Sequence, residues 1–308
     1  MPLKIKKTVI ITGYGCNNRC QFCIDADKRH IPEKTTKEVM LELISAKGRG
    51  RSYLEIIGGE PTIRPDIFQL IKFAKKLKFK TILIATNGRM LAYEDFAQKF
   101  INAGVTSIIF SIHGHNAELH DKLTQVQGSF DQLKRGIQNV QKLGFKNIGS
   151  NTTIVKDNYR YLVKIGRFIY NNGIHNAEFI FVDPTIGGAK KNFKKIVPRI
   201  SDAAPYIKKC LNFGERIGAQ HWHIRYVPLC YFPEYEHRIS EVYEVQHFQT
   251  EHLAPDFQNH EVENSRLIYG RQRTSRCKKC DFLARKCEGI WKEYIKHYGD
   301  KELKCKKF

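Results

Sequence analysis

Apolar strand-like runs alternate with helix-like segments about six times between residues 7 and 182, and this alternation limits the folds open to the chain. The run Val9-Ile10-Ile11-Thr12 is typical of a buried strand, and residues 66–77 have the apolar spacing of an amphipathic helix. Repeated strand–helix–strand units form parallel sheets with right-handed crossovers. The sequence therefore predicts an α/β fold built on a parallel sheet.

The same patterns give approximate bounds for each element. Strands are predicted at residues 7–12, 53–57, 80–85, 107–112, 147–155, 178–182 and 221–226. Helices are predicted at residues 36–47, 66–77, 93–103, 131–143, 159–171 and 203–217. The polar segment 231–273 is predicted to be irregular. A length of 308 residues favours about two domains, or one barrel with an extension, so we divide the chain into residues 1–200 and 201–308.

Three cysteines, Cys16, Cys20 and Cys23, follow the first predicted strand at C-x3-C-x2-C spacing. Parallel β/α units place their chemistry at the carboxyl ends of the strands, which is where this loop lies. Three thiols cannot pair among themselves without leaving one over, and a zinc site would need a fourth protein ligand. An iron–sulfur cluster held by only three thiolates keeps one iron open for a substrate-like ligand. Three structural or zinc cysteines are the alternative interpretation.

Polar or glycine-rich turns follow the next strands. Gly58-Gly59-Glu60-Pro61 ends the second strand, where glycines let a ligand approach the backbone and Glu60 offers a carboxylate to an ammonium group. Thr86-Asn87-Gly88 and Ser111 end the third and fourth strands, and Asn151 lies within the fifth. Taken singly, each is equally explained as a strand-end turn or as a satisfied polar group on a barrel rim.

The cysteine triplet, followed about 35 residues later by Gly58-Gly59-Glu60-Pro61, resembles the radical S-adenosylmethionine (SAM) superfamily over residues 7 to about 183. The resemblance implies a partial (β/α)6 TIM-type barrel. It implies that Cys16, Cys20 and Cys23 hold a 4Fe-4S cluster whose fourth iron is chelated by the amino and carboxylate groups of SAM. It also implies reductive cleavage of SAM to methionine and a 5′-deoxyadenosyl radical, which abstracts hydrogen from a substrate.

The same resemblance assigns residues around SAM. The Glu60 motif corresponds to the one for the SAM amino group, and Phe22 corresponds to an aromatic residue near the adenine, although ordinary packing also explains Phe22. Ser111 is similar to a carboxylate or ribose contact, and Asn151 to a ribose contact. The predicted cofactor-binding set is Phe22, Gly58, Gly59, Glu60, Pro61, Asn87, Ser111 and Asn151.

A histidine cluster, His113, His115 and His120, follows the fourth strand. His113 stands where relatives often carry an acidic residue. Such a cluster can bind a metal ion or a substrate, whereas surface histidines are the more common case. The sequence leaves both interpretations open.

A second group of cysteines lies toward the C-terminus, as Cys277-x2-Cys280-x6-Cys287, with Cys230 upstream and Cys305 beyond. It resembles the auxiliary-cluster extensions, called SPASM or twitch domains, of radical SAM enzymes that modify peptides and proteins. A full SPASM extension needs more cysteines for two clusters than remain here, so the predicted C-terminal cysteine-rich extension holds one auxiliary 4Fe-4S cluster. Its predicted ligands are Cys230, Cys277, Cys280 and Cys287, with Cys305 as the alternative fourth ligand. A zinc knuckle is the competing interpretation.

Composition gives expectations about the compartment. No apolar run approaches the roughly 20 residues that a membrane span needs, and a strand-like segment follows the basic N-terminus without a signal-peptide pattern. A cytoplasmic protein is therefore expected, in which nine cysteines indicate metal binding or catalysis over disulfides. Cys210 has no close cysteine neighbour and is expected to be a buried small hydrophobe.

Three functions remain as hypotheses. The leading one is radical modification of a peptide or protein side chain, with a reducing partner such as ferredoxin or flavodoxin. The second is radical modification of RNA or a nucleotide, because a net charge of +21 indicates either a polyanion partner or a lysine-rich, solvated surface. The third is a non-catalytic iron–sulfur or zinc protein that binds nucleic acid, and Gly58-Gly59-Glu60-Pro61 speaks against it.

Overall fold

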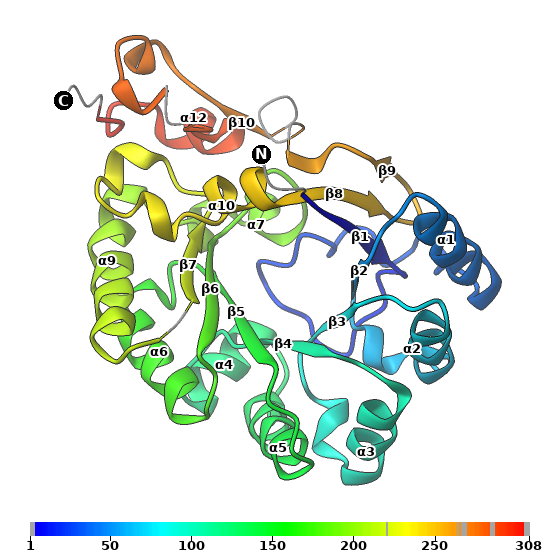
Figure 1. Cartoon of the computed structure of the whole chain (residues 1–308). Coiled ribbons are helices and arrows are strands. Elements are labelled where there is room, and N and C mark those ends of the chain that lie inside the picture. Colours follow the sequence, from blue (N-terminus) through cyan, green and yellow to red (C-terminus); the bar gives the residue numbers. More distant parts are fainter. Residues whose placement is uncertain (1–3, 220, 264, 266–269, 284–286, 305–308) are drawn as a thin grey trace.

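The computed structural model describes residues 4–219, 221–263, 265, 270–283 and 287–304 (Figure 1). Its main feature is a nine-stranded sheet of order β7-β6-β5-β4-β3-β2-β1-β8-β9 that curls into a partial barrel. Neighbouring strands are parallel except for β8 and β9. The strands are β1 (Ile5–Ile11), β2 (Tyr53–Ile57), β3 (Thr81–Thr86), β4 (Ser107–Ser111), β5 (Ile148–Ile154), β6 (Asn176–Phe181), β7 (His221–Arg225), β8 (Phe248–Leu253) and β9 (Gln258–Asn259).

Helices such as α1, α2, α3, α5, α6 and α9 lie around the outside of this sheet, whereas α12 lies in the C-terminal part (Figure 1). The helices are α1 (Thr36–Gly48), α2 (Ile67–Lys76), α3 (Glu94–Ala103), α4 (Ala117–Thr124), α5 (Ser129–Lys142), α6 (Leu162–Asn171), α7 (Gly187–Lys191), α8 (Phe193–Ile196), α9 (Ile200–Arg216), α10 (Ser240–His247) and α12 (Lys292–Tyr298). A capping box starts α1, because Thr35 accepts a hydrogen bond from the Glu38 N–H and the Glu38 carboxylate accepts one from the Thr35 N–H. The predicted α/β class and partial TIM-type barrel are confirmed.

A row of isoleucines crosses the first five strands and fixes their register. The row pairs Ile10 with Ile56, Ile56 with Ile84, Ile84 with Ile108, and Ile108 with Ile148. All five side chains are buried and belong to the core beneath the helices. Because side chains alternate along a strand, the residues next to this row point into the barrel. Both faces of the sheet are thereby defined, and the loops after β1 to β4 emerge at one end of the barrel.

The prediction that residues 231–273 are irregular is wrong, because β8 and α10 lie within this segment. Strand β8 pairs with β1 in parallel, with Ile5 opposite Phe248. Its sequence lacks an apolar run because a charge, Glu251, occupies its centre and is completely buried. The guanidinium groups of Arg49 and Arg51 pair with this carboxylate at 2.8 and 3.2 Å. The strand is therefore stabilised by ion pairs that hydrophobic patterning does not detect.

The C-terminal part packs against the barrel near α9 and contains a small second sheet. Strands β10 (Arg271–Gln272) and β11 (Ile290–Trp291) pair antiparallel, and α12 follows directly. In α12 the buried Tyr294 hydroxyl accepts a hydrogen bond from the Ile200 N–H at 2.8 Å. The division at residue 200 stays a prediction, and β7 and β8, which follow it, extend the barrel sheet at both ends. In the described part of the chain every helix is too short or too polar to cross a bilayer.

Candidate active site

The loop after β1 presents Cys16, Cys20 and Cys23 as free, half-buried thiols. The Cys16 sulfur accepts a hydrogen bond from the Asn18 N–H at 3.3 Å, and a turn links the Cys23 N–H to the Cys20 carbonyl at 3.1 Å. Burial raises the pKa of Cys16 to about 11, and proximity to the Cys23 thiolate adds to this. Arg29 lies near all three thiols and favours their thiolate forms. Three converging sulfurs with nearby donors fit a cluster, whose binding would displace the thiol protons.

A segment after β6, which sequence analysis did not single out, holds this loop from one side. The Gly188 N–H donates to the Cys23 carbonyl at 2.8 Å. A Cβ atom at Gly188 would overlap the carbonyl of Gln21, and one at Gly187 would overlap that of Cys23. The Gly187-Gly188 pair itself was the only available signal in the sequence, and its contact partner lies more than 160 residues away.

The glycines of the second-strand motif serve the same loop. Gly58 and Gly59 have φ angles of 90° and 44°, in the left-handed region that side chains rarely adopt. A Cβ atom at Gly59 would overlap the carbonyl of Gly15, and the Glu60 N–H donates to that carbonyl at 2.8 Å. The turn at residues 58–61 is therefore packed directly against the cysteine loop.

The Glu60 carboxylate is only 3% exposed and is surrounded by protein donors. One oxygen accepts from the N–H and hydroxyl of Thr62 at 3.0 and 2.6 Å and from the Thr86 hydroxyl at 2.7 Å. The other oxygen accepts from the Asn87 N–H at 2.6 Å. Burial raises the pKa of Glu60, and these four donors oppose that shift. The carboxylate thus ties the end of β2 to the end of β3.

From the end of β3, Asn87 and Arg89 reach the cysteine loop. The Asn87 side-chain amide donates to the Asn17 side-chain oxygen at 2.7 Å and lies 4.0 Å from the Cys16 sulfur. The Arg89 guanidinium donates to the Asn17 carbonyl and to the Asn18 side-chain oxygen. Sequence analysis predicted Asn87 and missed Arg89, whose position directly after the strand-end turn is the signal that could have identified it.

On the other side of the loop, Phe22 packs edge-on against the His113 ring with 4.8 Å between centroids. His113 and His120 are buried, and burial lowers the pKa of His113 to about 3 and that of His120 to about 4. Both rings are therefore neutral near pH 7, and the His113 Nδ1 accepts a hydrogen bond from the Thr153 N–H. The surface interpretation of these two histidines is wrong, because the rings form part of the wall behind Phe22.

Ser111 and Asn151 lie side by side at the end of β4 and in β5. The Asn151 carbonyl accepts a hydrogen bond from the Ile112 N–H at 2.9 Å, which continues the pairing past Ser111. Both side chains alternate with the buried isoleucine row and so point into the barrel. The structure therefore places these two predicted contacts on the wall of the barrel interior.

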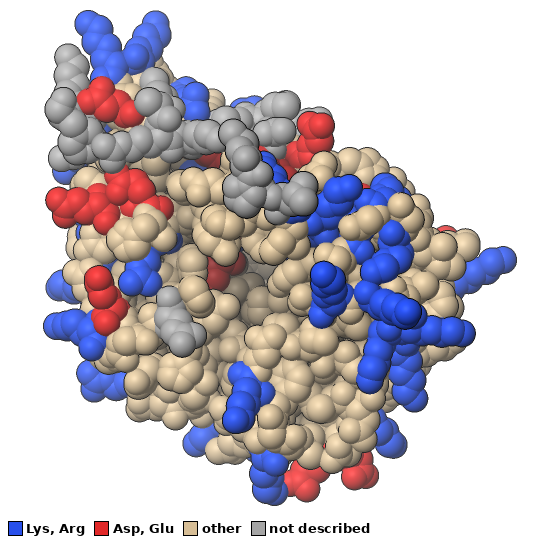
Figure 2. Space-filling view, viewed as in Figure 1, with Lys and Arg blue, Asp and Glu red and all other residues tan. Residues whose placement is uncertain are grey.

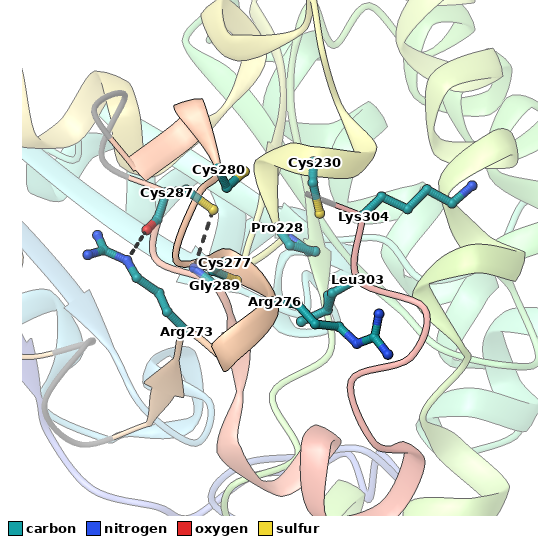
Figure 3. Close-up of a pocket in the computed structure, with 10 residues that line it drawn as sticks. All are labelled: Pro228, Cys230, Arg273, Arg276, Cys277, Cys280, Cys287, Gly289, Leu303 and Lys304. Carbon is teal, nitrogen blue, oxygen red and sulfur yellow. Dashed lines mark hydrogen bonds between the residues drawn. The ribbon is translucent and has the colours of Figure 1, made fainter. Parts of the chain in front are cut away.

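Four cysteines of the C-terminal part line one small cavity (Figure 3). Cys230 follows Pro228, while Cys277 and Cys280 are joined by a turn in which the Cys280 N–H donates to the Cys277 carbonyl at 3.0 Å. The Cys287 sulfur accepts from the Leu229 and Gly289 N–H groups at 3.5 and 3.4 Å. Burial, with the other three thiolates nearby, raises the pKa of Cys230 to about 12. The structure thus brings together the four predicted ligands.

Basic side chains surround this cavity, namely Arg273, Arg276 and Lys304 (Figure 3). Cys305 lies outside the described residues. Cys210 is buried, as expected, and its thiol donates to the Leu162 carbonyl. Within the described ranges, no three His, Cys, Asp or Glu side chains are arranged to hold a single metal ion.

The Radical SAM superfamily model matches residues 10–169. That segment is more than half of the chain and contains the cysteine triplet and the turn at residues 58–61, so the chain belongs to the Radical SAM superfamily. Proteins of this superfamily are enzymes that use a 4Fe-4S cluster and SAM.

The relatives with similar sequences carry names that describe different activities. An AdoMet-dependent heme synthase of Methanosarcina barkeri is 32% identical over 173 residues, which are 56% of this chain and 49% of the relative. A probable GTP 3′,8-cyclase of Saccharolobus islandicus is 27% identical over 219 residues, which are 71% of this chain and 69% of the relative. The chain thus spans about half the length of the heme synthase that it matches.

Two solved structures are similar over nearly the whole chain. Streptococcus suis SuiB bound to the precursor peptide SuiA has a TM-score of 0.68 at 17% identity, over 94% of this chain and 72% of SuiB. The protein anSMEcpe with bound AdoMet and Cp18Cys peptide has a TM-score of 0.69 at 14% identity, over 98% of this chain and 93% of that protein. At these identities the similarity establishes the fold, and it extends into the C-terminal part.

Proposed function

We propose that this radical SAM enzyme modifies a peptide or protein side chain and holds one auxiliary 4Fe-4S cluster in its C-terminal part. The observation that carries the proposal is the convergence of Cys230, Cys277, Cys280 and Cys287 on one cavity. Four thiolates are the usual complement for such a cluster. Two enzymes that were solved with bound peptides have a similar fold, and the similarity includes the C-terminal part of this chain. This similarity supports a peptide substrate.

Cys16, Cys20 and Cys23 would hold the first cluster, which together with SAM supplies one-electron chemistry that generates a radical from the cofactor. The contacts to SAM are proposed to come from Phe22, Gly58, Gly59, Pro61, Asn87, Ser111 and Asn151. For Glu60 we propose an indirect contribution, because its oxygens already accept four hydrogen bonds from the chain. A reduced ferredoxin or flavodoxin is the proposed electron donor.

Modification of RNA or a nucleotide is the second candidate. It is favoured by the net charge of +21 and by the similarity to a probable GTP 3′,8-cyclase. The cysteine cavity favours the peptide instead, because the predicted extension resembles those of peptide-modifying and protein-modifying enzymes.

Replacing cysteines by alanine in anaerobically reconstituted protein tests the cluster assignments. Each of Cys16→Ala, Cys20→Ala and Cys23→Ala is expected to abolish reductive cleavage of SAM to 5′-deoxyadenosine, because each removes an irreplaceable ligand. The triple variant should retain roughly four irons per chain, and further loss of Cys277 and Cys280 should remove those as well. Cys210→Ala is the control, since this thiol lies in neither group.

Two results would contradict the proposal separately. A triple variant that still cleaves SAM would overturn the first cluster, and one zinc in place of iron would overturn the auxiliary cluster. The substrate class is tested by comparing peptides and nucleotides of cells with the wild-type gene and with the triple variant. A mass shift confined to RNA or nucleotides would replace the peptide by the second candidate.

A further inference from the structure

Positive charge is concentrated in the C-terminal part of the chain. Residues 270–308 contain 13 Lys and Arg residues against 5 Asp and Glu residues, which gives a net charge of +8 in 39 residues. The whole chain carries +21 in 308 residues, so this segment holds more than a third of the excess in about an eighth of the length. The same segment supplies three of the four cysteines of the auxiliary cavity, which is the cavity lined by Cys230, Cys277, Cys280 and Cys287.

Most carboxylates of this segment already have a basic partner. Four of the five lie 3.6 Å or less from a cation, in the pairs Arg276–Asp300, Arg199–Glu302, Lys296–Glu293 and Arg271–Glu288. Several exposed cations around the auxiliary cavity make no ion pair with a described carboxylate. We call them the basic rim, and they are Arg273, Lys278, Lys279 and Lys304.

The basic rim lies directly beside the auxiliary cavity. Arg273 and Lys304 line the cavity, and the Arg273 Nε donates to the Cys287 carbonyl at 2.8 Å (Figure 3). Lys278 and Lys279 lie between two of the lining cysteines in the chain, and both lysines are exposed. A group bound in the cavity is therefore bordered by exposed positive charge.

Another side of the auxiliary cavity belongs to the barrel. Pro228 and Cys230 line this side and follow β7, which runs parallel to β6. The Leu229 N–H donates to the Cys287 sulfur at 3.5 Å, so this side is joined to the cysteines of the C-terminal segment. The carboxyl ends of parallel strands meet at one end of a barrel, which here is the end where the cysteine loop follows β1. The cavity is therefore lined both by the basic rim and by residues at this end of the barrel.

The cysteine loop has no comparable excess of positive charge. Residues 16–33 contain three Lys and Arg residues against three Asp and Glu residues. Of these, Lys28 pairs with Asp256 at 2.8 Å. Opposite charges on two proteins steer them toward each other and set their orientation when they meet. Charge therefore favours the basic rim over the cysteine loop as the place where an acidic protein docks.

We propose that the basic rim docks an acidic electron-transfer protein, which reduces the auxiliary cluster in the adjacent cavity. The inference rests on the proposed function, which assigns a cluster to this cavity. In this step the donor loses one electron and the auxiliary cluster gains it, while no bond forms or breaks. Interfaces between electron-transfer proteins are small and short-lived, so a few exposed charges are sufficient to form one. Nucleic acid is attracted by the same charge, but the position of the rim beside four cysteines favours a redox protein.

Binding of an oxidised flavodoxin, which is an acidic flavoprotein, tests the docking surface without turnover. Isothermal titration calorimetry at low salt measures its affinity for the anaerobically reconstituted protein. The double variant Lys278→Gln/Lys279→Gln is expected to bind flavodoxin about fivefold more weakly, because two exposed ion pairs are lost. Lys75→Gln/Lys76→Gln is the matched control, since these neighbouring lysines are also exposed and lie on α2. Iron content and thermal melting check the double variant, and Lys304→Gln is the second variant if either changes.

The rate of electron transfer gives an independent readout. The triple variant Cys16→Ala/Cys20→Ala/Cys23→Ala is expected to keep the auxiliary cluster alone, so its reduction is observed without SAM cleavage. Stopped-flow absorbance with reduced flavodoxin should show reduction slowing about fivefold when Lys278 and Lys279 are also replaced. The difference should shrink as salt is added, because salt screens exposed charges.

Three outcomes overturn the docking surface. They are no binding of flavodoxin to the wild type, equal weakening by the rim variant and the α2 control, and loss of hairpin RNA binding in the rim variant with flavodoxin binding unchanged. The last outcome would assign the surface to nucleic acid. Failure of the proposed function is distinguishable, because zinc in place of iron in the triple variant overturns the auxiliary cluster whatever flavodoxin does. An intact cluster whose reduction does not depend on the rim would overturn the docking surface alone.

Discussion

The carboxylate of Glu60 joins the ends of two neighbouring strands, β2 and β3. Its sequence position after two glycines predicts contact with an ammonium group, and this contact stays a prediction. In the structure its oxygens accept from Thr62, Thr86 and Asn87. Asn87 in turn holds Asn17 of the cysteine loop. The buried carboxylate thereby links the ends of β2 and β3 to the cysteine loop through Asn87. Removing the carboxylate would leave several buried donors without an acceptor.

Glu60→Gln tests this link. The new amide group must face an N–H or O–H donor, so we expect the free energy of unfolding to fall by about 1–3 kcal/mol. SAM affinity should fall too, because Asn87 and the cysteine loop lose their support. Denaturant unfolding and equilibrium SAM binding measure the two effects, with Glu94→Gln as the exposed control. Unchanged values for both would show that the carboxylate is not needed for the site.

Gly188→Ala tests the support on the opposite side of the loop. The added methyl group would overlap the Gln21 carbonyl, so the loop must shift away from its cluster-binding position. We expect iron per chain to fall from roughly eight to roughly four, with the auxiliary irons retained. Gly48→Ala is the control, because a Cβ atom there meets no atom within 4 Å. Full iron content in the Gly188 variant would contradict this role.

At the scale of elements, β8 depends on charge where the other strands depend on apolar contacts. Glu251 is completely buried and receives Arg49, Arg51 and His260. Removing one partner of a buried ion pair costs more free energy than forming the pair gains, because the remaining charge stays buried without a counter-charge. The attachment of β8 to the barrel is therefore sensitive to a single carboxylate.

Glu251→Gln is expected to lower the free energy of unfolding at pH 7 by about 3–5 kcal/mol, because the buried Arg51 loses its counter-charge. Burial alone would raise the pKa of Glu251, but Arg49, His260 and Arg51 outweigh burial and the pKa is lowered. A carboxylate whose pKa is lower in the folded than in the unfolded protein contributes its full stabilisation at pH values above its unfolded-state pKa. This stabilisation is lost as the pH falls through its folded-state pKa. Urea unfolding should thus show the difference from wild type shrinking below about pH 4. A constant difference would exclude this cause.

The elements that sequence analysis found are those whose stability is local or apolar. The residues of strands such as β3 and helices such as α2 themselves show the apolar spacing that is typical of the element. The cysteine triplet was found because its three members lie close together in the chain. Arg89 and Gly188 were missed because their roles depend on contacts with the distant Asn17 and Gln21. Long-range pairing leaves no periodic signal, and the same reason hid β8.

At the scale of the whole molecule, positive charge is in excess, with 52 Lys and Arg residues against 31 Asp and Glu residues. Lysines and arginines are spread over the face in Figure 2. Scattered surface lysines attract any polyanion without reading its sequence. The net charge therefore predicts nonspecific attraction to polyanions, which does not by itself identify a nucleic-acid substrate.

RNA and heparin are accordingly expected to bind the protein with similar affinity, and both affinities should fall steeply with salt, because counterions are released from the polyanion. Fluorescence anisotropy over a series of salt concentrations measures this for a hairpin RNA, a single-stranded RNA and heparin. A clear preference for one RNA fold that persists at physiological salt would contradict the expectation and favour the RNA-modifying candidate.

The pairing of β1 with β8 has a consequence for how the protein matures during synthesis. The cysteine loop leaves the ribosome early, directly after β1, but its supports at Gly188 and the neighbour strand β8 are made much later. Contacts between residues so far apart in sequence form late in folding, because a long segment of chain must first close into a loop. Until then the three thiols emerge without their native enclosure. On the proposed function, a cluster delivered before the barrel closes would meet a loop that lacks these contacts, so we expect cluster insertion to follow closure of the barrel.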